Sequence, residues 1–355
     1  MVDIANELEK QYDITIFTLY SKGELEKELS NNIHVKSLYK KSYNELTKIE
    51  KLKASLYVLL NKKKIYKKYI DDDNYLAQIA FLEGAITRIF SVRSKRTTKK
   101  IAWIHNDISK VFGSGIRSKI KRIIDRNAYE KYNTLVFVSI DNLDKFNKVY
   151  DDMLLPHEKV IHNYINADRV LDLAREDVRE IFDKTETNIV QVSRLVGQKA
   201  VDRLINVHAK LIKEGINHHI YIIGDGPEKE RLEKLIKEND VEKTFTLLGA
   251  KKNPYPYIKN ADFFCLFSNY EGYPMVVEEA KILRKYIAVT NTSAREVLID
   301  YPDYSIITTN SDIGIEKAIK TMISSNARRV EENNNYMYND KKIIDKIIKI
   351  IEEGK

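Results

Sequence analysis

Two successive series of short apolar runs, each run followed by a longer stretch of helical periodicity, dominate this sequence. The first series consists of ITIFTL, IHVKSL, LAQIAFL, KKIAWIH and TLVFVSI, and the second, which begins near residue 187, of NIVQVS, HIYIIG, TFTLLG, DFFCLFS, YIAVT and YSIIT. Short apolar strands that alternate with helices are typical of βαβ units and of parallel sheets buried on both faces. The sequence therefore predicts an α/β protein with two Rossmann-like, doubly wound domains.

The length of the chain agrees with two domains. A chain of 355 residues exceeds the size at which single hydrophobic cores stop growing, roughly 250–300 residues. The segment between the two series has polar turn chemistry and no sustained period, which places the connection at about residues 163–170. We expect a first domain over 1–168, a second over 169–335, and a C-terminal helix over 336–355 that packs back on the first domain.

The first series begins with a helix. Residues 1–10 have an amphipathic pattern, with Val2, Ile4, Ala5 and Leu8 on one face, and they lead directly into ITIFTL. In a Rossmann-like half, a strand and a Gly-rich turn precede this helix. The expectation is that the first domain lacks that strand and is less stable for it.

Composition excludes several classes of protein. The single cysteine, Cys265, excludes a disulfide framework and a thiolate zinc cluster, because both need several cysteines. The opening residues carry charges where a signal peptide has an apolar core, and no uncharged apolar run approaches the ~18 residues of a membrane span. We expect a cytoplasmic protein.

The positive charge is confined to the first half. Residues 1–170 contain 31 Lys and Arg against 22 Asp and Glu, whereas the remainder contains 29 against 30. The bases gather in residues 62–68 and between Arg88 and Arg126. Such a face attracts phosphates, unless it is only the solvated surface of a lysine-rich protein. No stacking platform or reading motif for nucleic acid accompanies it, so the expected partner is the anionic inner face of a membrane, where the protein would be peripheral.

The most specific stretch is SNYEGYPMVVEEA, residues 268–280, which follows the DFFCLFS run. A strand, a turn and a helix from about Met275 would point backbone N–H groups and the positive end of the helix to one spot suited to a phosphate. Glu271 and Glu279 are expected to accept hydrogen bonds from sugar hydroxyls on either side. Glu278 is expected to point elsewhere on the helix and to meet solvent.

At this point the chain resembles the retaining glycosyltransferases of family 4, which have the GT-B fold of two facing Rossmann-like domains with the active site in the cleft between them. The resemblance covers essentially the whole chain. It rests on the Ser-Glu-Gly-aromatic-Pro-Glu signature above and on further blocks, namely QVSRLVGQKA, IIGDGPEKERL, TLLGAKKN, ADFFCLFS, IAFLEG, IAWIHND, FVSIDN and VIHNYIN. The pairing of AFLEG with AWIHND is similar to enzymes of bacterial surface-polysaccharide and capsule assembly. Ala200 departs from the family, which usually has Gly there.

The resemblance implies a hexosyltransferase-type enzyme of EC class 2.4. It would move a sugar, without a metal and with retention of configuration, from a nucleotide diphosphate, with UDP favoured over GDP, to a glycan or lipid-linked glycan. An alternative is a catalytically weak GT-B subunit that binds nucleotide sugar and serves a partner glycosyltransferase. Residues 71–73 superficially supply the Asp-x-Asp motif of metal-dependent glycosyltransferases, but we interpret them as a solvated loop and expect no metal or other cofactor.

The resemblance also implies roles for single residues. Arg194 and Lys199 would stabilise the leaving phosphate, Glu271 would hold the transferred sugar, and His105 would face this sugar from the first domain. The donor would be held by Gly272, Tyr273, Pro274, Met275, Val276, Glu279, Gly224 and Gly249, and the acceptor by Glu83 and Asn106. Alternatives from the residues themselves stay open: Arg194 and Lys199 as surface residues, His105 as a core histidine, and Glu83 as the cap of the helix after Gly84.

Overall fold

The computed structural model describes residues 1–353 apart from residues 22, 24, 72–74, 94–97, 112–114, 152–155, 179, 180, 184 and 326–335. The chain divides into two compact units: Met1–Tyr164 with Asn339–Lys355 form unit 1, and Ile165–Tyr338 form unit 2. The division after residue 164 falls inside the predicted connection. None of the helices in the described part of the chain is long and apolar enough to cross a bilayer.

Unit 2 is built on one parallel six-stranded sheet with the strand order β12-β11-β10-β7-β8-β9. Its strands are β7 (Asn188–Val192), β8 (His219–Ile223), β9 (Phe245–Gly249), β10 (Phe263–Leu266), β11 (Tyr286–Thr290) and β12 (Ser305–Thr308). All six coincide with apolar runs of the second series. The chain order reverses between β7 and β10, which pair through Phe263 with Ile189 and Phe264 with Val190. In open parallel sheets, ligands bind at the carboxyl ends of the strands beside such a reversal.

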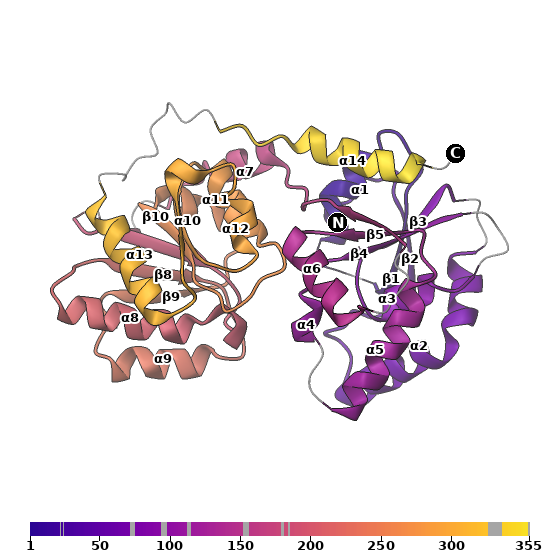
Figure 1. Cartoon of the computed structure of the whole chain (residues 1–355), viewed down its shortest axis with the longest axis horizontal. Helices are drawn as coiled ribbons and strands as arrows, with labels where there is room; N and C mark the ends of the chain where they lie inside the picture. Colours follow the sequence, from indigo (N-terminus) through magenta and orange to yellow (C-terminus); the bar gives the residue numbers. More distant parts are fainter. Residues whose placement is uncertain are drawn as a thin grey trace. The chain divides into compact units, whose positions relative to one another are not determined.

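Two layers of helices cover this sheet (Figure 1). The helices are α7 (Ala167–Leu173), α8 (Val201–Lys213), α9 (Lys229–Glu238), α10 (Tyr255–Asn260), α11 (Met275–Ile282), α12 (Ala294–Val297) and α13 (Asp312–Ser324). Helix α8 contacts α9 and α13 in one layer, and α11 contacts α7, α10 and α12 in the other. The strand residues Ile220, Ile222 and Phe263 form a buried core with Leu204 of α8 and Ile319 of α13.

Unit 1 contains two separate parallel sheets, of order β1-β2 and β3-β4-β5-β6. Its strands are β1 (Thr15–Tyr20), β2 (His34–Tyr39), β3 (Ala77–Ala80), β4 (Lys99–Ile104), β5 (Thr134–Phe137) and β6 (His157–Val160). Its helices are α1 (Val2–Leu8), α2 (Lys48–Tyr69), α3 (Ala85–Phe90), α4 (Ile108–Val111), α5 (Ile116–Tyr129), α6 (Ile140–Val149) and α14 (Asp340–Glu352). Helix α1 buries Ile4, Ala5 and Leu8, as its pattern predicts.

Strand β6 was not predicted. It pairs with β5 from His157 to Val160, within a stretch whose polar residues indicated only a turn. The strand lies at the sheet edge and its residues are exposed or half-buried, so the apolar run that marks an interior strand is absent.

The C-terminal helix α14 packs on unit 1. Its residue Glu352 accepts a hydrogen bond from the Tyr12 hydroxyl at 3.0 Å, and the backbone oxygen of Glu353 accepts one from Lys99 Nζ at 2.6 Å. Ile347, Ile350 and Ile351 are buried on one side of the helix. The chain therefore begins and ends in the same unit.

Candidate active site

Three neighbouring strands of unit 2 bring the predicted donor residues together. Strand β7 leads into residues 193–200, strand β10 into 267–274, and strand β11 into 291–293, and β10 is hydrogen-bonded to both of the others. The carboxyl ends of parallel strands share one edge of a sheet. Loops that are far apart in the sequence therefore meet here.

Lys199 and Glu271 form an ion pair at this edge. Lys199 Nζ lies 2.6 Å from Glu271 Oε1, and the two side chains are only 13% and 6% exposed. A pair so far removed from water is electrostatically stronger than one on the surface. Lys199 is thus not a surface residue at the start of a helix, which was the alternative. Arg194 is exposed, and its side chain makes no hydrogen bond or ion pair to a described residue.

The turn that carries Glu271 is fixed from both sides. From the β7 side, Gln198 Nε2 donates to the carbonyl oxygen of Tyr270 at 2.9 Å, and the Asn269 amide donates to the carbonyl oxygen of Gln198 at 2.8 Å. From the β11 side, the Ser293 hydroxyl donates to the carbonyl oxygen of Glu271 at 2.6 Å. These bonds preorganise the carboxylate before any ligand arrives.

Gly224 and Gly226 let the turn after β8 pack against the loop that carries Arg194. Gly224 has φ +148°, and a Cβ atom on it would lie 1.9 Å from the carbonyl oxygen of Ser193. A Cβ atom on Gly226 would lie 2.3 Å from the carbonyl oxygen of Leu195. The Gly224 amide also donates to the carbonyl oxygen of Gly249 at 3.0 Å. Both predicted donor glycines, Gly224 and Gly249, therefore support this edge through their backbones.

Helix α11 begins at Met275, with Pro274 at its N-cap and no side-chain cap. The N-cap side chain therefore accepts no hydrogen bond from the first backbone amides of the helix. An N-terminus of this kind is suited to bind an anionic ligand. Met275 is exposed, Gly272 and Val276 are half-buried, and Tyr273 and Pro274 are buried. Glu279 is half-buried one turn further on, and its Oε1 accepts a hydrogen bond from Tyr255 at 3.3 Å.

The expectation that Glu278 meets solvent is wrong. Glu278 is 3% exposed, accepts hydrogen bonds from Tyr273 at 3.0 Å and Tyr336 at 2.5 Å, and pairs with Lys281 at 3.0 Å. Burial, and then the charge of Glu278, raise the pKa of both tyrosines. Lys281 Nζ also contacts Asp300 at 2.7 Å. The network anchors the inner side of α11, and a helical period alone does not reveal such a polar interior.

In unit 1, Glu83 holds the turn after β4. Its Oε1 accepts from the backbone amides of His105 and Asn106 at 2.6 and 2.7 Å, and its Oε2 accepts from Asn106 Nδ2 at 3.1 Å. The N-cap of α3 is Gly84, without a side-chain cap. The interpretation of Glu83 as a cap of that helix is therefore wrong, because its carboxylate is committed to the β4 turn.

His105 follows β4 and lies 4.7 Å from the ring of Phe81. Burial lowers its pKa, although the charge of Glu83 and the hydrogen bonds that the ring makes to the backbone of Phe81 and the side chain of Asn163 act in the opposite direction. Its Nε2 atom is buried without a partner of standard hydrogen-bond geometry among the described residues. A neutral imidazole at the end of β4 is suited to a hydrogen bond with a substrate hydroxyl.

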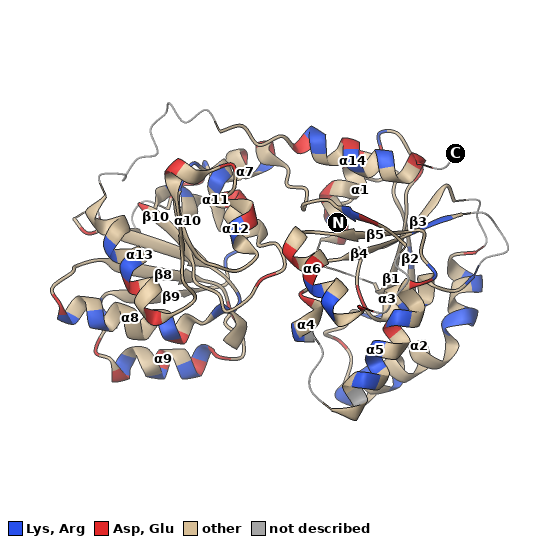
Figure 2. Ribbon diagram, in the orientation of Figure 1, with Lys and Arg blue, Asp and Glu red and all other residues tan. Residues whose placement is uncertain are grey.

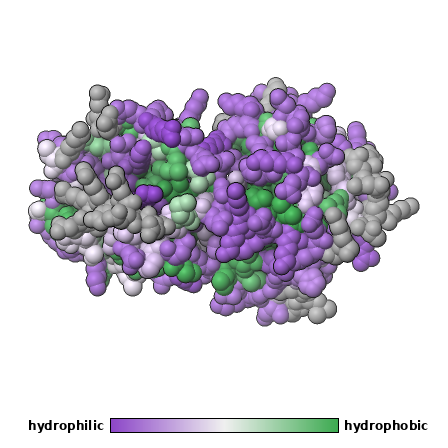
Figure 3. All heavy atoms as spheres, turned by 90° about the horizontal axis from the view of Figure 1, so that it is seen from above, coloured by the Kyte–Doolittle hydropathy of each residue, from purple (hydrophilic) through white to green (hydrophobic). Residues whose placement is uncertain are grey.

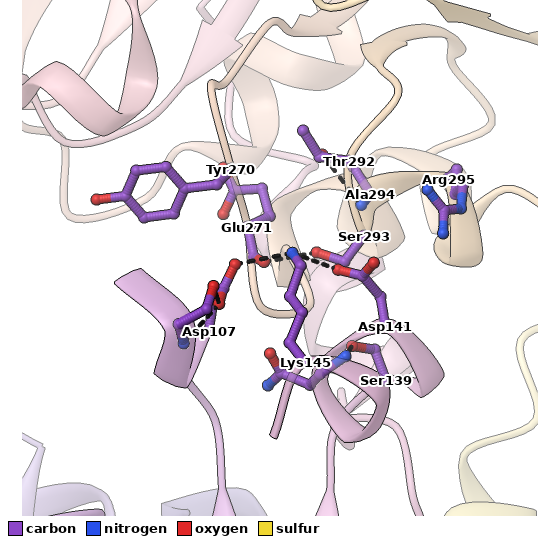
Figure 4. Close-up of polar contacts among 12 residues, drawn as sticks. Asp107, Ser139, Asp141, Lys145, Tyr270, Glu271, Thr292, Ser293, Ala294 and Arg295 are labelled. Atoms are coloured by element: carbon purple, nitrogen blue, oxygen red, sulfur yellow. Dashed lines mark hydrogen bonds and ion pairs between the residues drawn. The ribbon is translucent and has the colours of Figure 1, made fainter. Parts of the chain in front are cut away.

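An ion-pair cluster beside this turn was not predicted. Lys145 of α6 lies between Asp107 and Asp141, at 2.8 and 2.6 Å (Figure 4). Burial opposes the charge of Lys145, but the hydrogen bonds and charges of the two carboxylates prevail and raise its pKa. Asp107 lies far from α6 in the sequence, so helical spacing could predict only the i,i+4 pair of Asp141 and Lys145. The cluster therefore fixes the β4 turn to the start of α6.

Among the residues that the structure describes, no three His, Cys, Asp or Glu side chains form a group that could hold a metal ion. Residues 72 and 73 of the Asp71–Asp73 run lie outside the described part. The donor edge of unit 2 combines two cations, two carboxylates and the N-terminus of a helix, a set that can bind a phosphate and hydroxyl groups together.

Residues 174–352 match the family described as Glycosyl transferases group 1, which covers half of the chain. The chain belongs to this family. It is therefore a glycosyltransferase that uses a nucleotide sugar, and the predicted relationship to family 4 and the GT-B fold is confirmed.

The similar proteins include enzymes of glycan assembly. An uncharacterised glycosyltransferase of Methanocaldococcus jannaschii is 27% identical over 82% of this chain and 74% of its own. The N-acetylgalactosamine-N,N'-diacetylbacillosaminyl-diphospho-undecaprenol 4-alpha-N-acetylgalactosaminyltransferase of Campylobacter jejuni is 26% identical over 84% of this chain and 78% of its own. These likenesses extend beyond the segment that matches the family.

Solved structures share the fold. Anabaena HepE in complex with UDP-glucose has a TM-score of 0.76 at 15% identity and covers 99% of this chain and 94% of its own. WaaG, a glycosyltransferase involved in lipopolysaccharide biosynthesis, has a TM-score of 0.72 at 14% identity, with the same coverage. At such identities the likeness concerns the fold alone.

Proposed function

We propose that this enzyme transfers a sugar from a UDP-sugar, rather than a GDP-sugar, to a glycan or lipid-linked glycan in the synthesis of a cell-surface polysaccharide such as a capsule. We further propose that it retains the anomeric configuration and needs no metal. The observation that supports the proposal is the Lys199–Glu271 pair, in which an ammonium and a carboxylate lie 2.6 Å apart at the switch point of the unit 2 sheet.

The charges of this edge match a nucleotide diphosphate sugar. The diphosphate gains negative charge as it leaves, and Arg194 with its planar fork and Lys199 with its point charge would stabilise it. Glu271 keeps Lys199 in place in the free enzyme and would accept hydrogen bonds from the transferred sugar, while Glu279 would hold the ribose. Two cations that take this role make a divalent metal unnecessary.

The reaction we propose exchanges one bond for another at the same face of the sugar. The bond between the anomeric carbon and the phosphate oxygen breaks, and the acceptor oxygen forms the new bond at that carbon. The acceptor proton passes to the departing phosphate, so no side chain acts as a nucleophile. His105 and Asn106 of unit 1 would contact the reacting sugar and the acceptor, and Glu83 would position them.

Two sets of relatives support the choice of substrates. The solved structures include Anabaena HepE with UDP-glucose and a TarM mutant with UDP, which favours UDP as the nucleotide. The Campylobacter jejuni relative is named for an undecaprenol-linked substrate, and another relative for lipopolysaccharide core biosynthesis. An acceptor of this kind would be used at the cytoplasmic face of a membrane.

Titration calorimetry with UDP and GDP tests the donor site. We expect UDP to bind more tightly, and Lys199→Ala to weaken binding by roughly tenfold to a hundredfold, since hydrogen bonds to charged groups contribute about 1.5–3 kcal/mol. Lys234→Ala on α9, a lysine that is 78% exposed, is the matched control and should leave binding unchanged. Equal affinity for UDP in all three proteins would contradict the assignment.

Turnover tests the rest of the proposal. Activity with a lipid-linked acceptor should survive EDTA, and the anomeric coupling constant of the product, measured by NMR, should equal that of the donor. A requirement for Mg²⁺ or Mn²⁺ that is abolished by EDTA and restored by the metal would overturn metal independence. An inverted product would overturn the front-side reaction.

A further inference from the structure

Two helices of unit 1 expose rows of large aliphatic side chains. On α2, Leu52 and Leu60 are both 72% exposed, and on α5 Ile116 is 78% exposed. Their neighbours at helical spacing are exposed as well, so that each helix carries a continuous row. The rows consist of Ile49, Leu52, Leu56, Leu59 and Leu60 on α2, and of Ile116, Ile120 and Ile123 on α5.

These rows do not face the core. Helix α2 buries the opposite set, Ala54, Val58, Ile65 and Tyr66. An amphipathic helix normally buries its only apolar side, whereas α2 has a second apolar side in solvent. Figure 3 shows a different face, the one seen from above, on which apolar residues form patches separated by hydrophilic ones. An exposed row of five aliphatic residues on one helix is therefore expected to be a binding surface for a partner.

Both helices are rich in positive charge, as the blue segments of α2 and α5 in Figure 2 show. Helix α2 contains eight lysines and one acid, Glu50, and five of the lysines follow the break in the helix at Asn61. Helix α5 carries Lys119, Lys121 and Arg122 between its isoleucines and Arg126 after them, and its one acid, Asp125, is buried. A partner that covers these rows thus meets a predominantly positive field.

Both helices belong to one layer of unit 1. Each contacts α3, and Arg88 of α3 pairs with Asp125 of α5 at 2.6 Å. Burial, and then the nearby charges of Lys131, Arg88 and Lys63, lower the pKa of Lys62 on α2. Like charges are therefore held close together across this layer, an arrangement that an anionic surface would stabilise.

We propose that this α2–α5 face, formed by the two aliphatic rows and the bases around them, inserts into the headgroup region of an anionic bilayer. Helices that lie in a membrane interface combine a row of Leu or Ile with a face rich in Lys and Arg. The cores of protein interfaces are instead depleted in lysine, so a bilayer fits this face better than a protein partner. The inference deepens the proposed function, because a lipid-linked acceptor would be presented at the same surface.

Vesicle sedimentation separates insertion from simple charge attraction. We expect the enzyme to bind vesicles of phosphatidylcholine with about one-third phosphatidylglycerol, and vesicles of phosphatidylcholine alone much more weakly. The triple variant Leu52→Ser, Leu56→Ser, Leu60→Ser should bind the anionic vesicles at least about tenfold more weakly. The matched control, Ile299→Ser with Ile313→Ser, changes two isoleucines of unit 2 that are 72% and 79% exposed, and should bind like the wild type.

A tryptophan introduced on α2 reports how deeply this helix inserts into the bilayer. The only native tryptophan, Trp103, is buried, so a Leu56→Trp variant adds one exposed fluorophore. Its emission should shift to the blue with anionic vesicles and be quenched by lipids brominated on their acyl chains. An Ile313→Trp variant should show neither change.

Three outcomes would overturn the proposal. The first is unchanged vesicle binding by the triple serine variant, and the second is no blue shift in the emission of the Leu56→Trp variant. The third is complete loss of vesicle binding in high salt, which would mean that the aliphatic side chains contribute no binding of their own. Sedimentation velocity that shows a dimer of the wild type and a monomer of the triple variant would assign the face to a second copy instead. The vesicles contain neither donor nor acceptor, so a failure here is separate from a failure of UDP binding, which concerns unit 2.

Discussion

Two adjacent glutamates on α11 separate stability from substrate binding at the scale of single residues. Glu278 is buried against Lys281, whereas Glu279 is half-buried and contacts Tyr255. Glu278→Ala should destabilise unit 2 by about 3–5 kcal/mol, because it leaves the buried Lys281 ammonium with less compensating charge. Urea unfolding followed by circular dichroism measures this.

Glu279→Ala is the matched variant one residue away. It should change the free energy of unfolding by less than about 1 kcal/mol but weaken the binding of a UDP-sugar by roughly tenfold or more. The opposite result would contradict this assignment: a lower free energy of unfolding for Glu279→Ala, together with a stable Glu278→Ala that no longer binds the UDP-sugar. It would mean that Glu279 stabilises the unit and Glu278 binds the substrate.

The glycines at the donor edge allow a second test. Gly224→Ala should destabilise unit 2 by about 3 kcal/mol and weaken UDP binding, because the new Cβ would collide with the carbonyl oxygen of Ser193 and displace the loop of Arg194. Gly197→Ala lies in the same loop as Arg194, and its Cβ would meet Glu228 Oε1 only at 3.7 Å. This control should unfold within about 0.5 kcal/mol of the wild type. Equal stability of the two variants would disprove the tight contact.

At the scale of elements, a chain of histidines ties α8 to the strands beside it. His208 on α8 contacts His218 Nε2 through Nδ1 and the Thr244 hydroxyl through Nε2, both at 2.9 Å, and both histidines are fully buried. Burial, followed by the charges of His218 and His219, lowers the pKa of His208 to about 2. Burial also lowers the pKa of His218.

These shifts predict that unit 2 is destabilised by acid. A histidine that stays neutral in the folded chain takes up a proton on unfolding below its unfolded pKa of about 6.5. The stability that it contributes is therefore present above pH 6.5 and decreases as the pH falls, by about 2 kcal/mol at pH 5 for His208. Urea midpoints between pH 7.5 and 5 measure the slope. The His208→Gln variant should have a smaller slope of urea midpoint against pH, whereas the control variant His34→Gln, at an exposed position of unit 1, should keep the wild-type slope. Equal slopes in the wild type and His208→Gln would contradict the mechanism.

The elements also show what the sequence can predict. All interior strands could be located because both of their faces are apolar, whereas the half-buried edge strand β6 has no such mark. At the site, Glu271 is predicted from the signature and Lys199 from the separate QVSRLVGQKA block, but their contact depends on the pairing of β7 with β10, which no local pattern contains. The cluster of Asp107, Asp141 and Lys145 was missed for the same reason.

At the scale of the whole molecule, the two units differ in how their sheets are completed. In unit 2, four of the six strands have hydrogen-bonded neighbours on both sides, while in the described part of unit 1 only β4 and β5 do. One core beside β1 is small, with Ala5, Ile16 and Ile33 as its buried members, and Phe17, Leu19 and Leu38 of β1 and β2 are only partly buried where they pack against the main core of unit 1. A strand pair with little apolar cover opens at a low free-energy cost.

We therefore predict that β1 and β2 are the first sheet to open and that unit 1 unfolds before unit 2. In hydrogen exchange followed by mass spectrometry, peptides from residues 15–20 and 34–39 should exchange fastest, those from β4 and β5 more slowly, and those from β7 and β10 only through global unfolding of unit 2. Addition of UDP should slow exchange in unit 2, because a ligand stabilises the unit that binds it. Protection of β1 equal to that of β7 in the free enzyme would show that the two-stranded sheet is stabilised as strongly as the six-stranded one, and the expected order of unfolding would be wrong.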